Sequence, residues 1–85
     1  MEKIHEVQSW QVEEEYLYLT VDGVAYRILW TDCSPRLAQA SLDERSHLDI
    51  SPSGYGIHWP LVDEDLAIKP LLAQAEVLTV QNQAQ

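Results

Sequence analysis

Polar and apolar residues alternate strictly over residues 16–21. In an extended chain, one side carries Leu17, Leu19 and Val21, and the other carries Tyr16, Tyr18 and Thr20. A second β-rich run, residues 24–30, follows directly after Asp22 and Gly23. An Asp-Gly pair between two such runs is typical of a hairpin with a type I′ turn, because both turn residues need a positive φ. The pattern predicts a hairpin over residues 16–30, with Asp22 and Gly23 as structural residues.

The N-terminal segment has a less regular pattern. Ile4, Val7, Trp10 and Val12 stand among polar residues, at a spacing that fits neither a helix nor a regular strand. The enrichment in β-branched and aromatic residues favours a strand, with a bulge near residues 8–9.

A second hairpin is predicted over residues 48–59. Apolar residues alternate on both sides of a Ser-Pro-Ser-Gly turn at residues 51–54. Pro60 is expected to end the second strand of this hairpin, since proline cannot donate to a ladder. Trp59 is expected to be a structural residue of the core.

Two short helical segments are predicted between the hairpins, after a loop at residues 31–34. Ser34 is a suitable N-cap and Pro35 a suitable first helical residue, for a helix over residues 35–40. Ser41 and Glu44 match a capping box, which predicts a second turn or helix as far as His47.

The C-terminal part gives weaker signals. Lys69 precedes Pro70, which disfavours the helical region for Lys69, so a short helix is expected to start at Pro70. Residues 77–80 fit either a last strand or part of the tail. Residues 81–85 are expected to be frayed.

Together these elements predict one α+β domain over residues 1–80. Its centre would be a small antiparallel sheet of two hairpins plus an N-terminal strand, with short helices packed on one face. With 46% hydrophobic and 22% charged residues the chain is globular rather than disordered. At 85 residues the core is just sufficient, and formation of a homo-oligomer would help it.

Charge and cysteine content narrow the function classes. Five basic residues against 14 acidic ones give a net charge of −9, which disfavours direct binding of nucleic acid. A small basic protein partner fits better, although the acidity could serve solubility alone. The single Cys33 excludes an internal disulfide, and no apolar run indicates a membrane span or a leader. The cytoplasm is the expected location.

Candidate chemistry is sparse. His58 lies near Asp63, Glu64 and Asp65, a combination that could hold a divalent metal or act in acid–base catalysis. The alternative is that these carboxylates cap the following turn while His58 lies on the less apolar face of its strand. No HxH or HExxH spacing occurs, so we assign no catalytic residue, metal ligand or cofactor. Cys33 is interpreted as a half-buried thiol, with a pKa that Asp32 raises.

Three further features concern contacts. Arg36 and Arg45 could form ion pairs with the acidic residues at 63–65 or contact a partner. The chain has seven tyrosines and tryptophans and no phenylalanine. This composition suits an interface, and ordinary packing in the core and at its rim is the alternative. Tyr16 and Tyr18 share one face of the first hairpin and are candidate partner contacts. The other candidates for partner binding are Arg36, His58, Asp63, Glu64 and Asp65.

Several blocks occur in an order that resembles a known family. These blocks are Pro35-Arg36-Leu37, Ala38, Glu44-Arg45, Gly56-Ile57-His58-Trp59-Pro60, Asp63-Glu64-Asp65 and Leu71-Leu72. Over residues 16–73 the chain is similar to the domain of unknown function 2442 family. It departs from that pattern at residues 33–34, where the family has an aromatic residue before the Pro-Arg-Leu block.

The resemblance implies a small bacterial α+β domain with no established activity. Genes of this family often lie beside a second family, domain of unknown function 4160, and the pair resembles a toxin–antitoxin module with this member as the antitoxin. Some relatives add a helix-turn-helix domain, for which this chain is too short. The leading hypothesis is a non-enzymatic interaction protein. A metal- or small-molecule-binding domain at His58 and residues 63–65, and an accessory transcription-regulator domain, are the alternatives.

Overall fold

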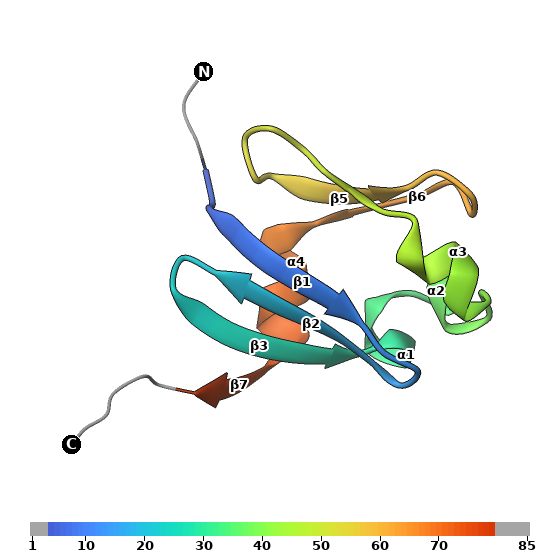
Figure 1. Ribbon diagram of the computed structural model, residues 1–85, viewed down its shortest axis with the longest axis horizontal. Helices are drawn as coiled ribbons and strands as arrows, with labels where there is room; N and C mark the ends of the chain where they lie inside the picture. The colour runs from blue at the N-terminus through green and yellow to red at the C-terminus, as the bar shows by residue number, and fades with distance from the viewer. Residues whose placement is uncertain (1–3, 80–85) are drawn as a thin grey trace.

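The computed structural model describes residues 4–79 and contains two antiparallel sheets (Figure 1). The larger sheet has the strand order β1-β2-β3-β7. Its strands are β1 (Val7–Val12), β2 (Tyr16–Val21), β3 (Val24–Leu29) and β7 (Glu76–Thr79). The α+β fold class is therefore confirmed. The predictions about residues 81–85 fall outside the described part of the chain.

The first hairpin forms as its alternation predicts. Asp22 and Gly23 have φ angles of 52° and 84°, as a turn of this type requires. Leu17, Leu19 and Val21 are at most 1% exposed, while the alternate residues of β2 are only half-buried. Burial of every second residue fixes the register, because a shift by one residue would expose the whole aliphatic set.

The two edge strands of this sheet, β1 and β7, also agree with sequence predictions. The register of β1 against β2 shifts between Val7 and Ser9, which confirms the predicted bulge. Of the two alternatives for the C-terminal segment, the strand is the one observed, because residues 76–79 form β7 and pair with β3.

The smaller sheet has the order β4-β5-β6 and was not expected as a separate sheet. Its strands are β4 (Asp49–Ile50), β5 (Gly56–Trp59) and β6 (Glu64–Ala67). The pairing of β4 with β5 confirms the second hairpin, and β5 ends directly before Pro60. The prediction of a single sheet is wrong, because the helical segment between β3 and β4 carries the chain to a second layer and β6, which was not predicted, completes it.

Three helical turns connect β3 to β4: α1 (Trp30–Cys33), α2 (Pro35–Ala38) and α3 (Leu42–Ser46). The hydroxyl of Ser34 accepts the backbone N–H of Leu37 at 3.1 Å, and the capping box of Ser41 and Glu44 is complete. Both predicted caps are confirmed. The predicted loop at residues 31–34 is instead mostly helical, since the buried Trp30 holds this turn against the core.

The last helix, α4 (Ile68–Gln74), starts two residues earlier than predicted. Pro70 lies in its first turn, where a missing N–H breaks no helical hydrogen bond. The N-cap of α4 is Ala67, which makes no side-chain cap. Asp63, Glu64 and Asp65 therefore do not cap this helix, and that interpretation of them is wrong. Asp63 lies in a turn, and the other two belong to β6.

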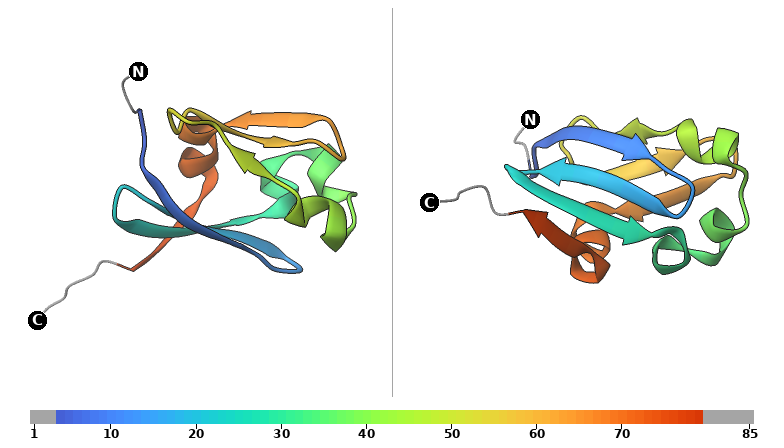
Figure 2. Two further views of the ribbon diagram at one scale, coloured as in Figure 1. Left: turned by 45° about the horizontal axis from the view of Figure 1, so that its top comes forward. Right: turned by 60° about the horizontal axis from the view of Figure 1, so that its bottom comes forward.

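The core lies between the two sheets (Figure 2). Leu17 and Ile28 of the larger sheet share it with Ile57 and Trp59 of the smaller one. The helices were expected to cover one face of a single sheet. Instead, α4 contacts both β3 and the strands β5 and β6, so helices and the second sheet cover the larger sheet together.

Candidate functional site

Tyr16 and Tyr18 lie side by side on the outer face of the larger sheet. Their ring centroids are 5.9 Å apart, and both residues are half-buried. The guanidinium of Arg27, opposite Tyr18 on β3, lies 4.4 Å from the centroid of the Tyr16 ring. Its Nε donates to a carboxylate oxygen of Glu76 at 2.8 Å, which raises the pKa of Arg27. The predicted common face of the tyrosines is confirmed, and Arg27 holds one of them in place.

A surface groove of about 660 Å³ lies over this face. Tyr16, Tyr18 and Thr20 line it from β2, and Trp10, which is 46% exposed, lines it from β1. The three consecutive glutamates at residues 13–15 also line it. We call its outer side the tyrosine face: the two tyrosines, Thr20, Ser9, Gln11 and the three glutamates. Trp10 pairs with Leu19, so its side chain lies on the other side of β1.

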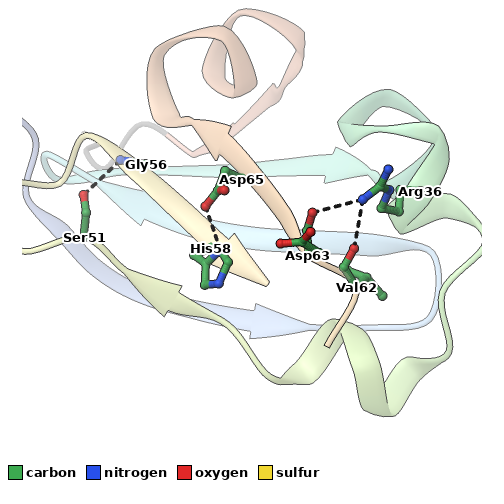
Figure 3. A network of polar contacts seen from close by, with 7 residues as sticks. All are labelled: Arg36, Ser51, Gly56, His58, Val62, Asp63 and Asp65. Atoms are coloured by element: carbon green, nitrogen blue, oxygen red, sulfur yellow. Dashed lines mark hydrogen bonds and ion pairs between the residues drawn. The ribbon is translucent and has the colours of Figure 1, made fainter. Parts of the chain in front are cut away.

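His58 occupies the outer face of the smaller sheet. Its Nδ1 lies 2.6 Å from a carboxylate oxygen of Asp65 on β6 (Figure 3). Asp49 of β4 lies opposite His58 on the other side. The side chains of His58 and Asp65 are 42% and 76% exposed. These residues, with Tyr55 and several apolar neighbours, line a second groove of about 600 Å³.

The other two acidic residues of this segment do not join His58. Asp63 has a φ of 54°, and its backbone carbonyl accepts a hydrogen bond from Arg36 at 3.0 Å (Figure 3). Glu64 lies opposite Trp59 in the register of the sheet. Within residues 4–79, no group of three or more histidine, cysteine, aspartate and glutamate side chains is placed to hold a metal ion. Of the four residues combined in the sequence, the structure therefore brings only His58 and Asp65 together.

The two arginines bind carbonyl groups, and the expected ion pairs with residues 63–65 are wrong. Arg36 donates to the backbone carbonyls of Val62 and Asp63. Arg45 donates to the carbonyls of three other residues, each at 2.9 Å, namely Glu14, Leu37 and Ala38. Among residues 4–79, neither arginine forms an ion pair with a carboxylate.

Arg45 also joins the two buried tryptophans, a role that no sequence signal marked. Its guanidinium lies 5.0 Å from the centroid of the Trp30 ring. Its backbone carbonyl accepts the indole N–H of Trp59 at 3.0 Å. The two indoles meet edge to face, with centroids 6.3 Å apart. The indole N–H of Trp30 donates to the carbonyl of Glu13, so every polar atom of this buried pair is satisfied.

The thiol of Cys33 is not activated. Burial and, to a smaller extent, the adjacent Asp32 raise its pKa to about 12, although Arg45 lowers it slightly. The interpretation of Cys33 as a half-buried thiol agrees with its position against the core. A thiol with such a pKa is protonated at neutral pH and is a poor nucleophile.

A contact between the N-terminal segment and the first hairpin was also missed. Nδ1 of His5 lies 3.0 Å from one carboxylate oxygen of Asp22, and the N–H of Glu6 donates to the other at 2.8 Å. The hydrogen bond to His5 is the main reason why the pKa of Asp22 is lowered. Asp22 therefore has a role beyond its turn, because it holds residues that precede β1.

The two outer faces lie on opposite sides of the shared core, so one flat partner cannot cover both Tyr16 and His58. The chain is thus a small α+β protein of two packed antiparallel sheets, with separate surface grooves. A family model matches residues 9–77, and the chain belongs to that family, described as protein of unknown function (DUF2442). No curated protein and no solved structure matches the chain.

None of the helices in residues 4–79 is long and apolar enough to span a membrane.

Proposed function

We propose that the protein is a non-enzymatic interaction protein of the cytoplasm, which binds a small basic protein on the tyrosine face. The observation that carries this proposal is the position of Tyr16 and Tyr18, side by side and partly exposed, beside three glutamates. Tyrosine is enriched at protein interfaces because its ring is apolar and its hydroxyl is polar.

The rigidity of this surface favours binding. Tyr16 is held between Tyr18 and the Arg27 guanidinium, which itself is bound to Glu76. Side chains that are already ordered lose little conformational entropy when a partner binds. The face therefore offers aromatic contact area at a low cost of ordering.

The negative charge of the protein favours a basic partner. Three glutamates line the groove, and the whole chain carries a net charge of −9. Such a field speeds the encounter with a basic protein and opposes an acidic one or a nucleic acid. The family resemblance adds a specific proposal for this basic partner, a small toxin of the domain of unknown function 4160 type that this protein would neutralise as its antitoxin.

The experiment has two stages. First, the tagged chain is purified from its own host, and a stoichiometric basic protein is identified and produced by itself. Its affinity is then measured for the wild type and for Tyr16→Ala and Tyr18→Ala. We expect at least tenfold weaker binding for each variant, since truncation of a tyrosine at the centre of an interface costs about 2 kcal/mol or more. His58→Ala, on the other outer face, is the matched control and should bind as the wild type does. Equal affinity of all four proteins would refute the tyrosine face as the binding site.

A second candidate is the groove at His58. An acid–histidine–acid row, Asp49, His58 and Asp65, lies beside apolar residues that line a groove of about 600 Å³. This arrangement supports a small cationic organic ligand better than a metal ion, because only Asp65 contacts the imidazole. Calorimetric titration of wild type and His58→Ala with Zn²⁺ and with spermidine would test both options. Heat from neither ligand in the wild type would remove this candidate.

A further inference from the structure

Beyond its bulge at residues 7–9, the outer edge of β1 lacks the devices that usually protect an edge strand. β1 is the outermost strand of the larger sheet (Figure 2), and its six residues, 7–12, include no charged residue and no proline. Natural edge strands are usually short, charged or covered, because free N–H and C=O groups pair with other chains. In the smaller sheet, β4 has only two residues and β6 begins with Glu64 and Asp65.

The backbone groups of Trp10 point away from the rest of the sheet. The N–H of Glu13 donates to the carbonyl of Tyr16 at 2.9 Å, which sets the alternation of the ladder between β1 and β2. By this alternation Gln11 exchanges hydrogen bonds with Tyr18, whereas the N–H groups of Trp10 and Val12 face outward. Within residues 4–79, the Trp10 backbone bonds to no loop, turn or side chain, and Trp10 is 46% exposed.

We infer that β1 accepts an extended segment of a basic partner as a fifth strand of the larger sheet. This inference rests on the proposed function and states how the partner binds. Hydrogen bonds from the partner backbone would satisfy the outward groups of Trp10 and Val12. Alternate side chains of the added strand would lie next to Ser9 and Gln11, at the border of the tyrosine face.

Charge determines which strand fits. β1 is flanked by Glu6 and Glu13, and the glutamates at 14 and 15 follow. A strand with arginines or lysines would place cations near these carboxylates. A second copy of β1, paired antiparallel through the outward groups with Trp10 opposite Trp10, would bring Glu6 of each copy close to the glutamates at 13–15 of the other, and like charges at such positions are destabilising. The edge therefore favours a basic segment over self-association.

The test uses the full ¹⁵N-labelled chain and two capped octapeptides. One peptide alternates arginine and valine, and the control alternates arginine and proline, with the same charge but no capacity for a regular ladder. We expect the first peptide to slow amide hydrogen exchange at Trp10 and Val12 at least tenfold. Gln11, whose N–H faces β2, should change little, and the proline peptide should protect none of the three amides.

Substitution at Trp10 separates the backbone from the side chain. Trp10→Pro removes the outward N–H and leaves the ladder to β2 intact, whereas Trp10→Ala removes the ring and keeps the N–H. The affinity for the Arg-Val peptide should fall at least tenfold further in Trp10→Pro than in Trp10→Ala, with folding checked by the amide spectrum. If Trp10→Pro does not fold, the exchange pattern of the wild type decides the question.

Three outcomes would overturn strand addition. Equal binding of both peptides, without protection of the Trp10 and Val12 amides, would leave the proposed function standing without a fifth strand. No binding of the Arg-Val peptide would refute the edge as a site, whatever the full-length partner does. Protection of Trp10 and Val12 that grows with protein concentration, without peptide, would assign the edge to a second copy.

Discussion

The two sheets share one core but present different outer faces and edges. The larger sheet carries Tyr16 and Tyr18 on its outer face and ends at an uncharged strand of six residues. The smaller sheet carries His58 between two aspartates and ends at a two-residue strand and an acidic one. Of the two sheets, the larger one combines exposed aromatic side chains with an edge strand to which another chain can add. The difference between the sheets supports our proposal that a partner protein binds on the larger sheet.

The largest expected effect concerns the stability contributions of two tryptophans, one from each sheet. Trp59 of the smaller sheet is fully buried, and Trp59→Ala should lower the free energy of unfolding by about 3–5 kcal/mol. Trp10 of the larger sheet is 46% exposed, so Trp10→Ala should cost less than about 1 kcal/mol. Urea denaturation measures both. A loss under about 1 kcal/mol for Trp59→Ala would mean that the smaller sheet contributes little to the core.

The second comparison concerns the two arginines that bind carbonyls. Arg45→Met should cost about 3 kcal/mol, because three partly buried or exposed carbonyls lose a charged donor and the Trp30 ring loses its cover. Arg36→Met removes two exposed hydrogen bonds and should cost less than about 1 kcal/mol. Thermal and urea unfolding provide the measurement. Equal losses for the two variants would contradict the role of the Arg45 guanidinium in holding the three carbonyls and the Trp30 ring.

The two glycines with positive φ, one in each hairpin turn, differ in the space around them. A Cβ at Gly54 would lie 1.9 Å from the carbonyl oxygen of His5, whereas a Cβ at Gly23 would meet no atom within 4 Å. Both substitutions carry the strain of a φ near 80°, about 1 kcal/mol for alanine. Gly54→Ala should cost about 2 kcal/mol or more, because the N-terminal segment must also move. Melting temperatures that fall equally would show that residues 4–5 do not pack on this loop.

The smallest effect is a pH dependence in the first hairpin. The pKa of Asp22 is lowered, mainly by its hydrogen bond to His5, so the folded state binds this proton less readily than the unfolded state. The stabilisation is present above the unfolded pKa, near 3.8, and is lost as the pH falls through the folded value. The difference in melting temperature between pH 6 and pH 3 should be smaller in Asp22→Asn than in the wild type. An identical difference in both proteins would show that Asp22 does not contribute.

Several elements could be predicted because their signals are local. Asp22 and Gly23 encode their own turn, Ser34 and Ser41 encode their caps, and the alternation at residues 16–21 encodes which side is buried. Each depends on φ and ψ preferences or on hydrogen bonds to residues within a few positions. The common face of Tyr16 and Tyr18 follows from the same two-residue period, so that part of the candidate site was accessible from sequence.

The rest depends on contacts between distant segments. Nothing near Arg45 indicates that it will bind the carbonyls of Glu14 and Leu37, and nothing near Trp10 indicates that β1 will be an edge. Residues 63–65 form a compact acidic motif in sequence, yet Asp63 lies in the turn before β6. Within β6, Glu64 and Asp65 face opposite sides, because successive side chains of a strand alternate.

The sequence by itself determined the turns, the caps, the alternating faces and the net charge, since these properties arise from neighbouring residues and from composition. The division of the strands into two sheets became visible only in the tertiary structure. The same holds for the face that each sheet contributes to the core and for the exposed edge of β1. The physical reason is that each apolar face must be covered by another element, and several covers satisfy the same local pattern. The choice among them depends on how all the faces pack at once.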